Sequence, residues 1–120
     1  MIYTSYYNNR NKGEGIYLAI SRYFPKWINK EDYIHLPALS PSDELREKYK
    51  NNEISFDTFT EMFSKEMTID KVKVLVDVIG FAIENNKDIY LCCHEKDREN
   101  CHRYYFYKLL QKYGIDCREL

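Results

Sequence analysis

The side chains able to do chemistry are concentrated in one short segment, residues 92–103. This segment holds three of the chain's four cysteines, two of its three histidines and two arginines: Cys92, Cys93, His94, Arg98, Cys101, His102 and Arg103. Thiols act as nucleophiles or metal ligands, imidazoles transfer protons, and guanidinium groups bind anions. The candidate chemistry is therefore thiol chemistry, metal binding or anion recognition.

This segment joins a predicted strand to a predicted helix. Residues 89–93 are apolar on both faces, which is typical of a buried parallel strand. Residues from about 101 to 113 place Phe106, Leu109 and Leu110 on one helical face, and Gly114 follows as a stop. The reactive side chains should therefore lie at the carboxyl end of a strand and the amino end of a helix, where α/β proteins commonly bind ligands.

The cysteines are expected to differ in role. Alternation along the strand puts Cys92 and Cys93 on opposite faces. We expect Cys92 to pack as a small apolar residue, and we assign Cys93 to the site because Glu95 and residues 101–103 follow closely. Cys101 begins the predicted helix, where the helix terminus stabilises a thiolate. His102 beside it is a candidate for proton transfer.

Arg103 precedes Phe106 by three residues and Leu110 by seven, so it should start on the buried face of the helix. A buried arginine needs an anionic partner. Two interpretations stay open. Arg103 forms an internal pair with Glu95 that shapes the loop, or it binds a phosphate or carboxylate ligand together with the helix amides.

A zinc site is not expected from the spacing of these residues. Zinc ligands usually come in pairs two to four residues apart, whereas Cys93 and Cys101 are farther apart and adjacent residues such as Cys101 and His102 point apart. The five residues between Cys92 and Arg98 match the spacing of the phosphate loop in cysteine phosphatases and sulfurtransferases. That loop needs small residues, and here it contains carboxylates and no glycine, so we treat the match as accidental.

The sequence also resembles a known family. Cys93-x-Glu95, five further residues and Cys101-His102-Arg103 resemble the signature of the bacterial domain of unknown function 488 family. Weaker agreement comes from Ile2-Tyr3-Thr4, from Ile20-Ser21-Arg22 with Pro25, and from Leu39-Ser40-Pro41-Ser42 with Leu45. Tyr6 departs from the small residue expected there. The resemblance implies a fold and a site that includes Arg22, but no defined activity.

The remaining pattern predicts an α/β fold in a single domain, residues 1–120, with a small, mainly parallel, Rossmann-like sheet flanked by helices. Strands are expected at residues 2–7, 15–21 and 115–120, with an irregular connection over residues 22–39. Ser40, Ser55 and Asp70 are expected to cap three helices, which end near residues 50, 67 and 85. The third helix has only a narrow polar stripe, so we expect it to be packed on several sides.

Composition gives no support to several classes of protein. The net charge is −1, from 18 basic and 19 acidic residues, so global charge does not indicate nucleic-acid or membrane binding. No membrane-length apolar run or signal peptide is apparent, and we expect a cytoplasmic protein. Its cysteines should then be thiols, metal ligands or reactive groups and not a disulfide framework. The 12 tyrosines follow no single pattern, and we attribute them to codon bias.

These observations predict a site that recognises a small anionic or nucleotide-like ligand, with conversion of that ligand left open. The candidate catalytic residues are Cys93, Glu95, Cys101 and His102, and the candidate ligand-binding residues are Arg22 and Arg103. No metal is expected, and the sequence defines neither a cofactor nor an oligomeric state. The alternative is a noncatalytic module for nucleic acid or protein, in which these residues are structural.

Overall fold

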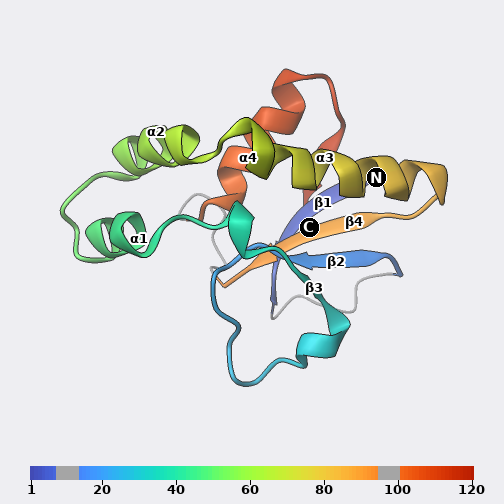
Figure 1. Ribbon diagram of the computed structural model, residues 1–120, viewed down its shortest axis with the longest axis horizontal. Coiled ribbons are helices and arrows are strands. Elements are labelled where there is room, and N and C mark those ends of the chain that lie inside the picture. Colours follow the sequence, from blue (N-terminus) through green and yellow to red (C-terminus); the bar gives the residue numbers. More distant parts are fainter. Residues whose placement is uncertain (8–13, 95–100) are drawn as a thin grey trace.

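A computed structural model of the chain describes residues 1–7, 14–94 and 101–120, and in this part of the chain five parallel strands form one sheet (Figure 1). The strand order is β3-β2-β4-β1-β5. The strands are β1 (Ile2–Tyr6), β2 (Ile16–Ala19), β3 (Ile34–His35), β4 (Ile89–Cys93) and β5 (Cys117–Glu119). The α/β class and the parallel sheet are confirmed. The short strand β3 lies in the connection that was predicted to be irregular.

The helices begin close to the predicted positions, but two caps differ. The structure contains α1 (Asp43–Lys50), α2 (Phe56–Glu66), α3 (Ile69–Glu84) and α4 (Arg103–Lys112), with 3₁₀ turns η2 (Lys30–Asp32) and η3 (Pro37–Leu39). Ser55 caps α2 as predicted. Ser42, and not Ser40, caps α1, because Ser40 instead ends η3 and bonds to the Pro37 carbonyl. Thr68 precedes α3, and Asp70 lies in its first turn.

The strand register gives the sheet two different faces. Aliphatic side chains such as Leu18 and Leu91 point to the face packed by α2, α3 and α4, where they meet Phe63, Leu75 and Phe106. The neighbouring positions point the other way, toward Phe24 and Tyr33 from the connection between β2 and β3. Figure 1 shows α3 and α4 along one side of the sheet and this connection away from them.

The second face is built on a row of stacked tyrosines. Tyr3, Tyr90 and Tyr17 lie in register on the neighbouring strands β1, β4 and β2. The Tyr17 and Tyr90 ring centroids are 4.4 Å apart and nearly parallel, and those of Tyr3 and Tyr90 are 5.1 Å apart. Tyr7 and Tyr33 pack on the same face. Tyrosines scattered along the sequence are therefore gathered by strand pairing, which corrects the expectation that they follow no pattern.

Helix α3 buries only one side. Leu75, Ile79 and Ala82 face the core, whereas apolar side chains on the outer side are exposed: Ile69, Val76, Phe81 and Ile83. The expectation that α3 is packed on several sides is wrong. A helix laid on a sheet can contact that sheet along only one stripe. No helix in the described ranges is long and apolar enough to cross a membrane.

The parallel arrangement brings the carboxyl ends of the strands to one edge. Helix α4 connects β4 to β5, which lies beyond β1 in the sheet, so the final parallel pair is β1 with β5. This edge therefore collects the residues that follow β1, β2 and β4, together with the start of α4. The described part of the predicted site, residues 92–94 and 101–103, lies there.

Candidate functional site

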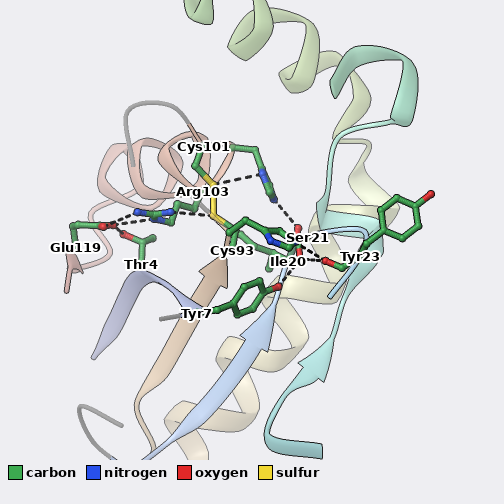
Figure 2. Close-up of a disulfide and its surroundings, with 11 residues drawn as sticks. Thr4, Tyr7, Ile20, Ser21, Tyr23, Cys93, Cys101, Arg103 and Glu119 are labelled. Atoms are coloured by element: carbon green, nitrogen blue, oxygen red, sulfur yellow. Dashed lines mark hydrogen bonds and ion pairs between the residues drawn. A yellow bond between two sulfur atoms is a disulfide. The ribbon is translucent and has the colours of Figure 1, made fainter. Parts of the chain in front are cut away.

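The centre of the site is a pair of cysteines joined in a disulfide (Figure 2). Cys93 is the last residue of β4, and Cys101 lies two residues before α4 begins. The sequence led us to expect thiols, metal ligands or reactive groups. For this pair the expectation of free thiols is wrong, and a reactive role stays a prediction. Cys92 points to the opposite face and is buried among the tyrosines, as the strand alternation predicts.

Arg103 connects this cysteine pair to the last strand. Its side chain is fully buried. Nε and Nη2 donate to the two carboxylate oxygens of Glu119 at 3.2 and 2.9 Å, and Nη1 donates to Cys93 Sγ at 3.0 Å. Thr4 Oγ1 also donates to Glu119, at 2.6 Å. The sequence suggested Glu95 as the internal partner of Arg103. Glu95 lies outside the described residues, and the carboxylate that the structure pairs with Arg103 is Glu119.

His102 is held as a neutral imidazole between Cys101 and β2. Its Nε2 lies 2.6 Å from the Ile20 carbonyl, which can only accept, so Nε2 carries the hydrogen. Nδ1 is then an acceptor and lies 3.7 Å from Cys101 Sγ. Burial lowers the pKa of His102 from 6.5 to about 4, although the contact with the Ile20 carbonyl acts in the opposite direction. His102 is therefore uncharged at neutral pH.

A second polar group lies at the same edge on the tyrosine side of the sheet (Figure 2). The Tyr7 hydroxyl hydrogen-bonds to Ser21 Oγ, which donates to the Tyr23 carbonyl at 2.9 Å. His94 Nε2 also donates to the Tyr23 carbonyl, at 2.7 Å, and His35 Nε2 lies 2.8 Å from the Ser21 carbonyl. Burial raises the pKa of Tyr7 to about 12, so it stays a neutral phenol. These contacts hold the segment after β2 against the ends of β1 and β4.

Arg22 lies at this edge, but its described contacts lead away from the cysteines. Its guanidinium donates to the Pro41 carbonyl at 3.3 Å, and its Nε lies 3.7 Å from an Asp43 carboxylate oxygen at the start of α1. Its side chain is 35 % exposed. The fold thus brings Cys93, Cys101, His102 and Arg103 together, while Arg22 stands apart from them.

The fold brings together three potential metal ligands. Cys93 Sγ, Cys101 Sγ and a ring nitrogen of His102 lie within 4.8 Å of one another, although their sequence spacing did not suggest this. Structural zinc usually takes four ligands, and the described residues supply three to this group. The fully buried Arg103 guanidinium also lies 3.0 Å from one of the sulfurs. The absence of a bound metal stays a prediction.

Sequence reasoning missed Glu119, Thr4, Tyr7 and Ser21. For Glu119 a signal was present. Alternation along the last strand puts Glu119 on the same face as Cys117, which is buried in the helix-side core. An acidic side chain on that face needs a cation, and Arg103 was the one predicted to be buried. No comparable local signal marks Tyr7 or Ser21, because their contact depends on how β1 and β2 are placed.

Comparison with known proteins supports the family resemblance carried by Cys93, Glu95 and residues 101–103. No curated protein and no solved structure matches the chain. A family model, DUF488-N3a, described as "Active DUF488-N3 subclade", matches residues 1–114. Because this match spans nearly the whole chain, the protein belongs to the DUF488-N3a family.

Proposed function

We propose that this domain binds a small anionic or nucleotide-like ligand at the carboxyl edge of its sheet and acts on it through a thiol of Cys93 or Cys101. The observation that carries the proposal is the 3.0 Å contact from Arg103 Nη1 to Cys93 Sγ. A guanidinium beside a sulfur favours the thiolate, which is the nucleophilic form of cysteine. Such pairing is typical of reactive thiols.

In this proposal the two arginines have different roles. Arg103 is fully buried and bonded to Glu119, so it acts through Cys93 and not by direct contact with the ligand. Arg22 is partly exposed at the same edge, and its ion pair with Asp43 is long, so it is the proposed anion contact. In the reduced site, His102 Nδ1 accepts a hydrogen bond from the Cys101 thiol, and a part for His102 in proton transfer stays a prediction. Glu95 remains the predicted proton acceptor or orienting group.

The alternative is a noncatalytic binding module. Thr4, Glu119, Arg103 and Cys93 form one connected chain of contacts that ties β1, β5, α4 and β4 together. Such a chain stabilises a loop whether or not any chemistry occurs. A module of this kind needs no reactive thiol, and this difference separates the two candidates experimentally.

The thiol proposal is tested by alkylating the reduced protein with iodoacetamide at neutral pH. All four cysteines are buried to a similar extent, but Cys93 and Cys101 should be labelled faster than Cys92 and Cys117, because the guanidinium and the helix terminus favour their thiolates. Inorganic phosphate should slow this labelling. Mass spectrometry of each labelled peptide against time gives the rates. Equally slow labelling of all four cysteines would favour the noncatalytic module.

The anion contact is tested with a matched pair of arginines. Arg22 and Arg46 both lie within 4 Å of the same Asp43 carboxylate oxygen, so replacing either removes a similar ion pair. Arg22→Gln should abolish the protection by phosphate, whereas Arg46→Gln should keep it. Equal loss of protection in both variants would contradict a specific role for Arg22.

Two further parts of the proposal concern the setting of the site. We propose a cytoplasmic location, where the thiols that the proposal requires are kept reduced. We also expect no stoichiometric zinc, because only three ligand atoms from the described residues converge and a guanidinium adjoins them. Elemental analysis after gel filtration checks this. One zinc per chain would overturn it.

A further inference from the structure

The disulfide has a feature that a structural crosslink does not require: a buried cation beside one of its two sulfurs. Cys93 and Cys101 are 1 % and 4 % exposed, and Arg103 donates to Cys93 Sγ. We propose that Cys93 and Cys101 form a redox couple, in which a small hydroperoxide oxidises the Cys93 thiolate and Cys101 then closes the disulfide. This inference rests on the same thiol site as the proposed function and adds a second chemistry to it.

Arg103 selects Cys93 as the first sulfur to react. Glu119 holds the guanidinium through two hydrogen bonds, which leaves Nη1 directed at Cys93 Sγ. A charge-assisted N–H···S⁻ contact stabilises the thiolate relative to the thiol. Cys92 is the internal comparison, since it lies on the same strand but points into the tyrosine face, on the opposite side of the sheet from Cys93 and its Arg103 contact. Burial of both reacting sulfurs restricts the oxidant to a small molecule.

Cys101 is positioned to resolve the oxidised sulfur. It lies eight residues after Cys93, and the fold brings the two sulfurs into bonding contact. His102 presents the unprotonated Nδ1 toward Cys101 Sγ, because Nε2–H is directed at the Ile20 carbonyl. In the reduced protein this nitrogen accepts a hydrogen bond from the Cys101 thiol. A nearby resolving thiol is the usual companion of a peroxide-sensitive cysteine.

The proposed reaction has two steps, oxidation of Cys93 to a sulfenic acid and then formation of the disulfide. The Cys93 thiolate attacks one oxygen of the hydroperoxide, an S–O bond forms and the O–O bond breaks. The leaving oxygen takes a proton and departs as water or an alcohol, so Cys93 is oxidised to a sulfenic acid and the hydroperoxide is reduced. Cys101 sulfur then attacks Cys93 sulfur. The S–S bond forms, the S–O bond breaks, and the hydroxyl leaves as water with the Cys101 proton.

Closing the disulfide removes both thiols on which the proposed function depends. A low-molecular-weight dithiol restores them by exchange, in which the disulfide is reduced and the dithiol is oxidised. Disulfides in the cytoplasm, the location proposed above, are usually transient and serve catalysis or redox sensing. The couple would thus switch the ligand-directed thiol activity off under oxidation and back on under reduction.

The experiment oxidises the reduced protein with one equivalent of hydrogen peroxide and quenches samples with a thiol alkylating agent. Mass spectrometry should show a Cys93–Cys101 disulfide, while Cys92 and Cys117 remain alkylated. In Cys101→Ser the sulfenic acid at Cys93 should accumulate and be captured by dimedone. In Cys93→Ser the rapid oxidation should be lost. We expect Cys93 to oxidise at least about tenfold faster than Cys92, since thiolate character sets the rate.

Several results would overturn the couple. These are equal oxidation rates for Cys93 and Cys92, dimedone capture at Cys101 in Cys93→Ser as fast as at Cys93 in Cys101→Ser, or a bound zinc that blocks the disulfide. Both serine substitutions are nearly isosteric, and circular dichroism checks that they fold. If the disulfide forms but phosphate does not slow the alkylation, the ligand proposal alone is contradicted. If phosphate slows the alkylation but no disulfide forms, the redox couple alone is contradicted.

Discussion

Arg103 joins the last strand to the cysteine pair through its contacts with Glu119 and Cys93. It is fully buried, and its charge is balanced by the Glu119 carboxylate. Neither residue would be tolerated at this place alone, because a buried charge without its partner loses hydration and gains nothing in return. The same pairing orients the guanidinium toward Cys93, so the structural and the proposed chemical roles of Arg103 share one geometry.

Arg103→Ala should lower the free energy of unfolding by about 3–5 kcal/mol, because Glu119 loses its cationic partner and keeps the Thr4 hydroxyl, and Cys93 loses the guanidinium donor. The control is Arg118→Ala on β5, the strand that also holds Glu119. This change removes an exposed ion pair with Asp116. That change should stay within about 0.5 kcal/mol of the parent. Urea denaturation at neutral pH measures both values. Equal losses in the two variants would contradict the assigned burial.

His102 makes stability depend on pH. Its pKa is about 4 in the folded chain, against 6.5 for a solvated histidine, so between these values the unfolded chain binds a proton that the folded chain does not. This contribution is complete above pH 6.5 and is lost as the pH falls toward 4. The loss amounts to about 3 kcal/mol, from roughly 2.5 pKa units at about 1.36 kcal/mol each.

The measurement is the free energy of unfolding against pH for the parent and two variants. His102→Gln should flatten the curve between pH 6.5 and 4, whereas His35→Gln, at an exposed histidine, should keep the parent slope. If His102→Gln left the slope unchanged, the imidazole would not be buried in its neutral form.

At the scale of elements, the hydropathy pattern of α3 led to a wrong prediction of how many of its sides are buried. Its sequence is apolar around most of the helix, yet the residues buried in the structure are Leu75, Ile79 and Ala82, with Val72 and Val78 packed against the core and partly buried. Ile79 is 9 % exposed and Ile83 is 73 % exposed. Hydropathy counted along a helix does not distinguish a side chain facing the sheet from one facing outward when both are isoleucine.

Two aspartate substitutions test this orientation with identical chemistry. Ile79→Asp should unfold the domain, because the buried carboxylate would have no cation among its apolar neighbours. Ile83→Asp should leave the free energy of unfolding within about 0.5 kcal/mol of the parent. Thermal unfolding followed by circular dichroism compares them. A parent-like thermal midpoint for Ile79→Asp would show that α3 is placed wrongly.

At the scale of the molecule, the start of β2 is fitted closely against β4. Gly15 has a φ of 156°, and a Cβ added there would lie 2.6 Å from the Asp88 carbonyl oxygen and 2.9 Å from a ring carbon of Tyr90. Gly80 on α3 has no atom within 4 Å of such a Cβ. A substitution at Gly15 therefore tests how closely β2 is packed against β4, and a substitution at Gly80 tests whether the outer face of α3 is open.

Gly15→Ala should lower the free energy of unfolding by about 1–3 kcal/mol, through backbone strain and the clash with β4. Gly80→Ala should raise it by about 1 kcal/mol, because alanine favours the helix and meets no obstacle. Both should unfold in one cooperative transition if residues 1–120 form a single unit, as proposed. Separate transitions by fluorescence and circular dichroism would contradict that unit.

Local patterns in the sequence determined much of this protein. The apolar run at residues 89–93 predicted a buried parallel strand, and Ser55 predicted the start of α2. The dense chemistry of residues 92–103 indicated the candidate site, and the opposite orientations of Cys92 and Cys93 were predicted from alternation. These features depend on neighbours within a few residues, where strand and helix periodicities act directly.

Only the tertiary structure decided the strand order, the Arg103–Glu119 pair, the Cys93–Cys101 disulfide and the stacked row of Tyr3, Tyr90 and Tyr17. Each of these joins different elements of the fold, and the row of tyrosines spans three strands. Periodicity tells which face of a strand a residue occupies, but not which strand lies beside it. That choice is made by the crossovers and by the burial of both faces of the whole sheet, so the partners of Arg103 and Tyr90 follow from the fold and not from their local sequence.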